Sequence, residues 1–207
     1  DSNDDLVICT QFYDYIDVGS EVYTSAGDVD IMVAKFNKDN GTVIWAKQFG
    51  AEGGDWARSL VVNSNNEVIV TGAAQNTVDF GGIVISGGNS NRYAVIFCLD
   101  ENGNVQWADN IDHIAGASRG HAVTVDQDNN IYSLGYFISD FDIGGFSGEQ
   151  YDGFNNYILK HDVNGTCEWV KPIISTFIWP SYKININSEA NFYINGNGIT
   201  DSLMIEG

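Results

Sequence analysis

The segment Thr42-Val-Ile-Trp45-Ala-Lys-Gln-Phe49 decides how the chain is organised, because it occurs three times. It returns as Asn104-Val-Gln-Trp107-Ala-Asp-Asn-Ile111 and as Thr166-Cys-Glu-Trp169-Val-Lys-Pro-Ile173, so that the tryptophans stand 62 residues apart both times. A glycine precedes each tryptophan by four residues, at Gly41, Gly103 and Gly165. A fixed period of this kind is typical of a repeat architecture.

Each repeat is predicted to contain four strands and a short hairpin, because β-branched and aromatic runs alternate with Gly, Asn, Asp and Ser. In the best-defined copy we expect strands at 55–62, 67–72, 93–99 and 105–111, with a hairpin at 79–85. Continuous apolar runs such as Val68-Ile-Val70 predict sheets that are covered on both faces. Apolar residues nowhere follow a helical period over several turns. Second strands are expected to end at Gly72, Gly135 and Gly196, where the chain must turn or a neighbouring backbone comes close.

These features predict an all-β fold, a β-propeller built of four-stranded antiparallel blades. The single domain or propeller segment would hold a partial blade (1–50), two blades (51–112 and 113–174) and a second partial blade (175–207). Propellers close with roughly four to eight blades. We therefore expect the chain to complete its ring with further sequence or with other copies of itself, and its first residue, Asp1, favours a processed chain or a fragment.

The segments 35–50 and 55–72 resemble the SBBP repeat, the "seven-bladed beta-propeller" repeat of bacterial secreted proteins. The shared pattern is a lysine, a glycine turn, a tryptophan, and then a first strand and a second strand ending in Thr-Gly. Asn63 and Asn187 depart from it where the pattern has aspartate. The resemblance implies a propeller in a secreted or cell-surface bacterial protein, and it implies no single activity. The spacing of Gly41 and Trp45 is also similar to the tryptophan-docking motif of quinone-dependent propellers, where it joins blades.

The chain is strongly acidic, with 28 Asp and Glu against nine Lys and Arg and a net charge of −19. A surface of this sign repels phosphate backbones, which argues against nucleic-acid partners. No apolar run approaches the roughly 18 residues that a membrane span needs, so no membrane insertion is expected. The cysteines are odd in number and lie at different places in the repeat, which supports neither a disulfide framework nor a zinc site: Cys9, Cys98 and Cys167.

Residues present in every repeat are predicted to be structural. The tryptophans would fill the gaps between blades, and Gly41, Gly103 and Gly165 would supply positive φ in turns. A recurrent aspartate beside glycine is expected to cap a turn, at Asp17, Asp79 and Asp142. A ring of carboxylates that binds Ca²⁺ is the alternative for these aspartates. No other metal or cofactor is predicted.

Residues that differ between repeats are the better candidates for binding a ligand. The first strand of each blade lines the central channel of a propeller, so its variable side chains would meet there. His113 also lies near these positions in the third copy, and scattered polar residues bridged by water are the alternative interpretation. The predicted binding residues are Trp56, Arg58, Arg119, His121, Tyr182 and Lys183.

Three functions follow as hypotheses. The first is a non-catalytic extracellular scaffold or binding module that recognises a protein or a glycan. The second is a structural repeat of an adhesin or extracellular filament. The third is a propeller enzyme with its site in the central channel, such as a lyase, a hydrolase or a quinone-dependent dehydrogenase. No catalytic residue is predicted, because no spacing typical of a nucleophile, phosphate loop or metal triad occurs.

Overall fold

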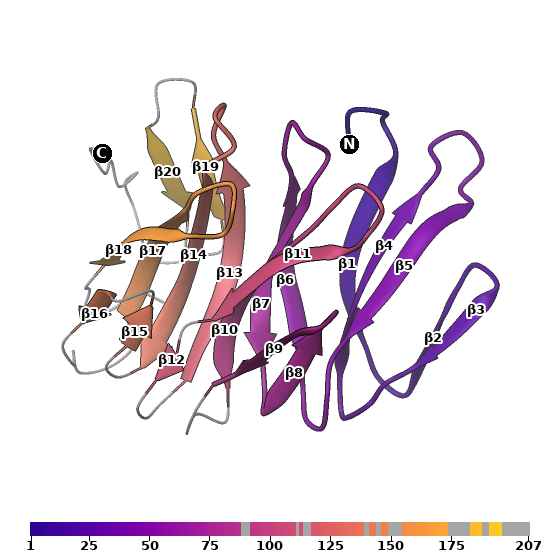
Figure 1. The fold of residues 1–207 in the computed structure, drawn as a ribbon, viewed down its shortest axis with the longest axis horizontal. Coiled ribbons are helices and arrows are strands. Elements are labelled where there is room, and N and C mark those ends of the chain that lie inside the picture. The colour runs from indigo at the N-terminus through magenta and orange to yellow at the C-terminus, as the bar shows by residue number, and fades with distance from the viewer. Residues whose placement is uncertain are drawn as a thin grey trace.

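The structure, a computed structural model, describes residues 1–87, 92–110, 112–113, 117–138, 141–143, 146–148, 155–173, 183–187 and 191–195. Within these ranges the chain consists of strands, turns and loops without a helix, which confirms the all-β class. The strands form small antiparallel sheets that stand side by side, from the N-terminal sheet at the right of Figure 1 to the C-terminal one at the left. The described sheets do not close a ring.

Four of these sheets follow the predicted repeat. The first has the order β1-β4-β5, the second β11-β10-β7-β6 and the third β13-β14-β17-β18. The fourth is described as the pair β19-β20. The bounds are β1 (Leu6–Phe12), β4 (Asp30–Phe36), β5 (Val43–Phe49), β6 (Trp56–Val62), β7 (Val68–Ala74), β10 (Tyr93–Leu99), β11 (Val105–Asn110), β13 (Ala117–Val125), β14 (Ile131–Ile138), β17 (Asn155–His161), β18 (Cys167–Ile173), β19 (Lys183–Ile186) and β20 (Phe192–Asn195).

In each of the first three sheets a short hairpin follows the strand that corresponds to the second strand of the repeat, namely β1, β7 and β14. These hairpins run along the lower side of the molecule in Figure 1. They are β2 (Tyr15–Val18) with β3 (Glu21–Thr24), β8 (Thr77–Phe80) with β9 (Ile83–Ser86), and β15 (Phe141–Ile143) with β16 (Phe146–Gly148), the last extended by β12 (Asp112–His113).

The apolar runs are continuous because successive side chains of a strand point to opposite faces, and a neighbouring sheet covers each face. Along β7, Val68 and Val70 join a cluster with residues of the first sheet. Ile69 between them joins a cluster with Val123 and Ile131 of the third sheet. The second sheet is therefore buried on both faces, as its sequence predicts.

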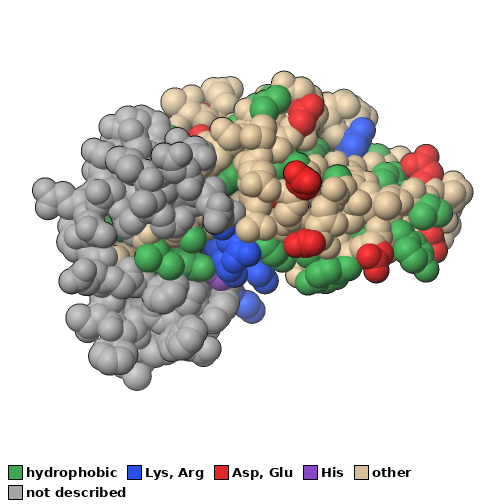
Figure 2. All heavy atoms as spheres, turned by 90° about the horizontal axis from the view of Figure 1, so that it is seen from below, with side chains coloured by type: hydrophobic (Ala, Val, Ile, Leu, Met, Phe, Trp, Pro, Cys, Tyr) green, Lys and Arg blue, Asp and Glu red, His purple; other side chains and the backbone are tan. Residues whose placement is uncertain are grey.

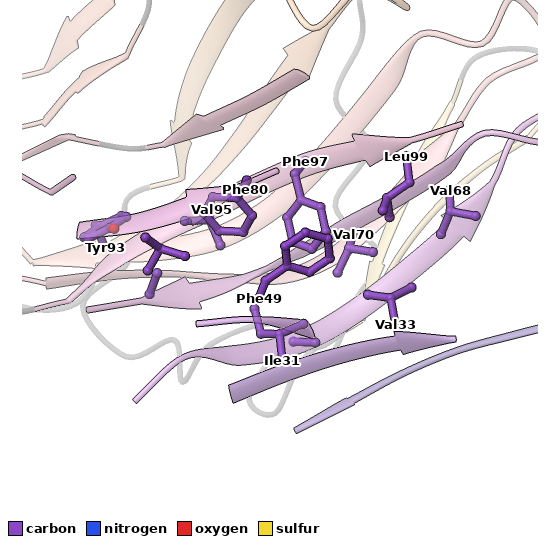
Figure 3. Close-up of a cluster of buried hydrophobic side chains, with 13 residues drawn as sticks. Ile31, Val33, Phe49, Val68, Val70, Phe80, Tyr93, Val95, Phe97 and Leu99 are labelled. Atoms are coloured by element: carbon purple, nitrogen blue, oxygen red, sulfur yellow. The ribbon is translucent and has the colours of Figure 1, made fainter. Parts of the chain in front are cut away.

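Three phenylalanines fill the space between the first and second sheets (Figure 3). The ring centroid of Phe97 lies 5.0 Å from that of Phe49 and 4.9 Å from that of Phe80. They come from three elements, β10, β5 and β8. Aromatic pairs at such distances add to the free energy gained by burying their area, so this cluster fastens the two sheets together.

The repeated tryptophans lie against the turn of the next sheet. Trp45 donates its indole N–H to the carbonyl of Glu101 at 2.9 Å, and a Cβ at Gly103 would stand 2.8 Å from its ring. The Trp107 ring packs on Gly165, where a Cβ would stand 2.3 Å from it, but its indole N–H has no hydrogen-bond partner among the described residues. Trp169, on the third sheet, instead joins a cluster with residues of β19 and β20. The glycines Gly41, Gly103 and Gly165 have φ of 70°, 79° and 82°, as their turns require.

The prediction that second strands end at Gly72 and Gly135 was wrong, because β7 continues to Ala74 and β14 to Ile138. The predicted close approach of a neighbouring backbone is confirmed at both glycines, and Gly196 lies outside the described residues. A Cβ at Gly72 would lie 1.8 Å from the carbonyl oxygen of Trp56, and one at Gly135 would lie 2.2 Å from that of Arg119. The glycine thus allows a distortion of the neighbouring strand rather than ending its own.

Candidate functional site

The distorted strands orient two of the predicted binding residues. The pairing of β6 with β7 shifts register between Ala57 and Ser59, which leaves Arg58 as an extra residue. The pairing of β13 with β14 shifts between Gly120 and Ala122, which leaves His121 as its counterpart. Bulges of this kind redirect side chains and are frequent beside functional sites. Both repeats thereby present a basic or titratable side chain at the same place on the first strand.

Four of the predicted residues belong to one cluster. Trp56 and Arg119 occupy equivalent positions on β6 and β13, and the guanidinium carbon of Arg119 lies 5.9 Å from the Trp56 ring centroid. His121 stacks on Tyr136 with ring centroids 5.5 Å apart. Arg119 also lies 6.0 Å from the Tyr136 ring. We call this group, with Arg58 and Arg92, the arginine–aromatic cluster.

Arg92 and Tyr136 were missed by sequence reasoning. The guanidinium carbon of Arg92 lies 4.3 Å from the Trp56 ring centroid, the shortest of these contacts. Arg92 directly precedes β10 and pairs with Ala117 in an isolated parallel bridge, which brings it beside β13. The rarity of arginine in the sequence could have pointed to Arg92. The chain has three arginines, Arg58, Arg92 and Arg119, and all three belong to the cluster.

The cluster carries an excess of positive charge. Burial lowers the pKa of the Arg92 guanidinium, and the charges of Arg119 and Arg58 lower it further. Burial, with the charges of Arg58 and Arg119, lowers the pKa of His121 to about 4, so its imidazole is neutral at pH 7. Figure 2 shows basic side chains gathered beside a histidine on the face seen from below, with acidic side chains elsewhere on that face. Like charges collected in this way favour a bound anion.

The other predicted site residues lie apart from the cluster or outside the described chain. Lys183 begins β19 and is exposed, and no ring contact of the cluster involves it among the described residues. Tyr182 lies outside the described residues. For His113 and Asp142 the structure describes the backbone, on β12 and β15, but not the side chains.

Of the recurrent aspartates, one is seen to accept a hydrogen bond in a turn. Asp79 accepts a hydrogen bond from the backbone N–H of Gly82, while Asp17 lies exposed on β2. Asp100 accepts backbone N–H groups of Asn102 and Asn104. Among the described residues no group of three His, Cys, Asp or Glu side chains is placed to hold a metal ion. Nor does that part of the chain contain a helix long and apolar enough to cross a membrane.

A buried carboxyl group, Asp55, lies next to the cluster. It is 0% exposed and accepts backbone N–H groups of Ala51 and Gln75, each at 2.9 Å. Burial raises the pKa of Asp55 from 3.8 to about 6, opposed by these hydrogen bonds and assisted by the charge of Asp30. Asp55 therefore links the segment at Ala51 to the segment at Gln75 through hydrogen bonds, and its pKa of about 6 lies close to neutral pH.

The titration of Asp55 predicts a pH-dependent stability. Its folded-state pKa is raised, so the stabilisation that protonation gives is complete below about pH 4 and is lost as the pH rises through about 6. One pKa unit corresponds to about 1.4 kcal/mol, so the whole effect is about 3 kcal/mol, of which about 1.4 kcal/mol falls between pH 7.5 and pH 5. Denaturant unfolding at these two pH values should show a smaller gain in Asp55→Asn. Equal gains in both proteins would contradict the assignment.

Comparisons with known proteins bear on the fold alone. No protein-family model and no curated protein matches the chain. The crystal structure of a protein of unknown function from Bacteroides caccae is similar to it, with a TM-score of 0.53 and 13% sequence identity. The match covers 95% of this chain and 54% of that one, so the chain spans about half the length of this neighbour.

Proposed function

We propose that the chain is part of a β-propeller that serves as a non-catalytic binding module, with its ligand at the arginine–aromatic cluster. The observation that carries the proposal is the contrast between repeated and variable residues. The Gly–Trp contacts recur from sheet to sheet, whereas the positions of Trp56 and Arg119, and of Arg58 and His121, hold different side chains. Residues that hold the sheets together are expected to be the same in every repeat, whereas residues that bind a ligand are expected to differ between repeats.

The first sheet supports the propeller because its outer face matches a face that is buried in the second sheet. Leu6 pairs with Phe36 as Val68 pairs with Leu99. Leu6 is 58% exposed, whereas Val68 is 1% exposed beneath the first sheet. Met32 and Ala34 on the same face are 0% exposed and cluster with the β2–β3 hairpin, so the open part of this face lies around Leu6. Since exposed apolar patches mark interaction sites, the occupant that fits this part of the face is a further sheet of the same repeat.

A location outside the cell, in a secreted or surface-attached bacterial protein, is part of the same proposal. The resemblance to the SBBP repeat and the acidic, sparsely charged surface support it. Protein and glycan ligands are both compatible with a rigid stack of sheets that presents one basic cluster.

Mass measurement tests the proposed neighbour of the first sheet. We expect the purified chain to associate into particles heavier than 22.6 kDa, because burial of the open face contributes about 25 cal/mol per Å² of apolar area. Leu6→Lys should restore the monomer, whereas Val84→Lys, at a residue 63% exposed on β9, should not. Light scattering and binding of an apolar dye would measure this. A folded monomer that binds no dye would contradict the proposal.

A further inference from the structure

Three separate segments bring every arginine of the chain to one place. Arg58 comes from β6, Arg119 from β13 and Arg92 from the residue before β10. Two of them lie over the Trp56 ring, at 4.3 Å and 5.9 Å from its centroid. Such cation–π contacts hold guanidinium planes without neutralising their charge. The contact with Trp56 therefore holds Arg119 in place while its guanidinium keeps its positive charge.

The chain has 28 acidic residues with which these arginines could pair. Within the described residues, however, neither Arg58 nor Arg119 forms a salt bridge, although Lys35, Lys38 and Lys160 all do. The Nε atom of Arg119 is buried without a hydrogen-bond partner in that same part of the chain. A buried donor left unsatisfied costs about 1–3 kcal/mol. An anion bound at this place would accept that donor and offset the repulsion between the guanidinium groups.

We propose that the arginine–aromatic cluster binds a compact oxyanion: a carboxylate, sulfate or phosphate group carried by a small molecule or by a single acidic sugar. The inference rests on the proposed binding function and names its ligand class. Guanidinium groups bind such oxyanions through paired N–H donors. A long polyanion is disfavoured because the rest of the chain, with a net charge of −19, repels its flanking charges.

His121 adds a pH dependence to this binding. It faces Arg58 of β6, Arg119 of its own strand and Tyr136 of β14, and burial together with the two cationic neighbours keeps it neutral. A bound oxyanion would reverse the local field and favour the imidazolium form. Binding should therefore take up a proton and tighten as the pH falls from 7 to 5.

Titration calorimetry at constant, low ionic strength is the test, with sulfate, inorganic phosphate, citrate and glucuronate as separate probes. We expect at least one probe to bind, and Arg119→Gln to weaken it roughly 10- to 100-fold, the range for charge-assisted hydrogen bonds. Lys38→Gln removes the same charge from an exposed ion pair with Asp4 and should change the affinity less than about twofold. If Arg119→Gln fails to fold, Arg58→Gln replaces it, because Arg58 is exposed. His121→Gln should flatten the pH dependence.

The outcomes separate the ligand class from the binding function. Heparin, titrated in the same way, serves as the long polyanion. Equal affinities of the Arg119→Gln variant and the wild-type protein, or tighter binding of heparin than of glucuronate, would overturn the oxyanion site. If none of the four anions binds, a glycan and protein array probed with wild-type protein and Arg119→Gln decides what remains. A ligand lost in the variant would keep the binding function and reject the compact oxyanion. Identical array profiles would reject both.

Discussion

Replacing Phe97 by alanine is expected to destabilise the fold by about 3–5 kcal/mol, the usual range for deleting a buried aromatic ring. Phe97 is 0% exposed and contacts both Phe49 of β5 and Phe80 of β8. Its removal leaves a cavity where the first sheet, the second sheet and a hairpin meet. Each of these elements is fixed by its hydrogen bonds to neighbouring strands, so the cavity can close only if a whole sheet moves. We therefore expect a destabilisation near the upper end of this range.

Denaturant unfolding measures this loss, and Val84→Ala is the matched control. Val84 lies on β9 of the same hairpin but is 63% exposed, so its truncation should change the free energy of unfolding by less than about 0.5 kcal/mol. A loss below about 1 kcal/mol in Phe97→Ala would mean that the first and second sheets do not share this core. In that case the arrangement of sheets in Figure 1 would not hold in solution.

The repeat made the order of strands predictable. The strand at Tyr93–Leu99 was predicted with the correct first and last residue. Once the repeats are aligned, a continuous apolar run between turn residues can be assigned only to a buried strand. The continuation of β7 past Gly72 was not predictable. Glycine ends strands and also accommodates bulges, and only the approach of the Trp56 carbonyl distinguishes the two cases.

The candidate site was predictable in part for a related reason. Trp56, Arg58, Arg119 and His121 stand out because the repeat aligns them and shows that they differ. Arg92 corresponds to Val29 and Phe154 in the neighbouring copies, and it belongs to a connecting segment rather than to a first strand. Its contact with Trp56 depends on the bridge to Ala117, which is a property of how two sheets pack and leaves no periodic signal in the sequence.

Three equivalent glycines offer a graded test of the contact between sheets. Gly41, Gly103 and Gly165 share positive φ values of 70°, 79° and 82°, so alanine pays a similar backbone penalty of about 1 kcal/mol at each. Their surroundings differ. A Cβ at Gly41 meets nothing within 4 Å, one at Gly103 lies 2.8 Å from the Trp45 ring, and one at Gly165 lies 2.3 Å from the Trp107 ring.

Gly165→Ala is therefore expected to cost about 2 kcal/mol more than Gly41→Ala, within the range for overpacking a buried contact, with Gly103→Ala between them. The Trp107 ring has little freedom to move away, because it stacks on His161 with centroids 5.6 Å apart. Chemical unfolding of the three variants measures the series, and the double variant Gly165→Ala with Trp107→Leu should recover part of the loss through a positive coupling between the sites. Equal losses at the three glycines would show that the indole does not rest on the following turn, and the sheets would then lack the fastening that repeats every 62 residues.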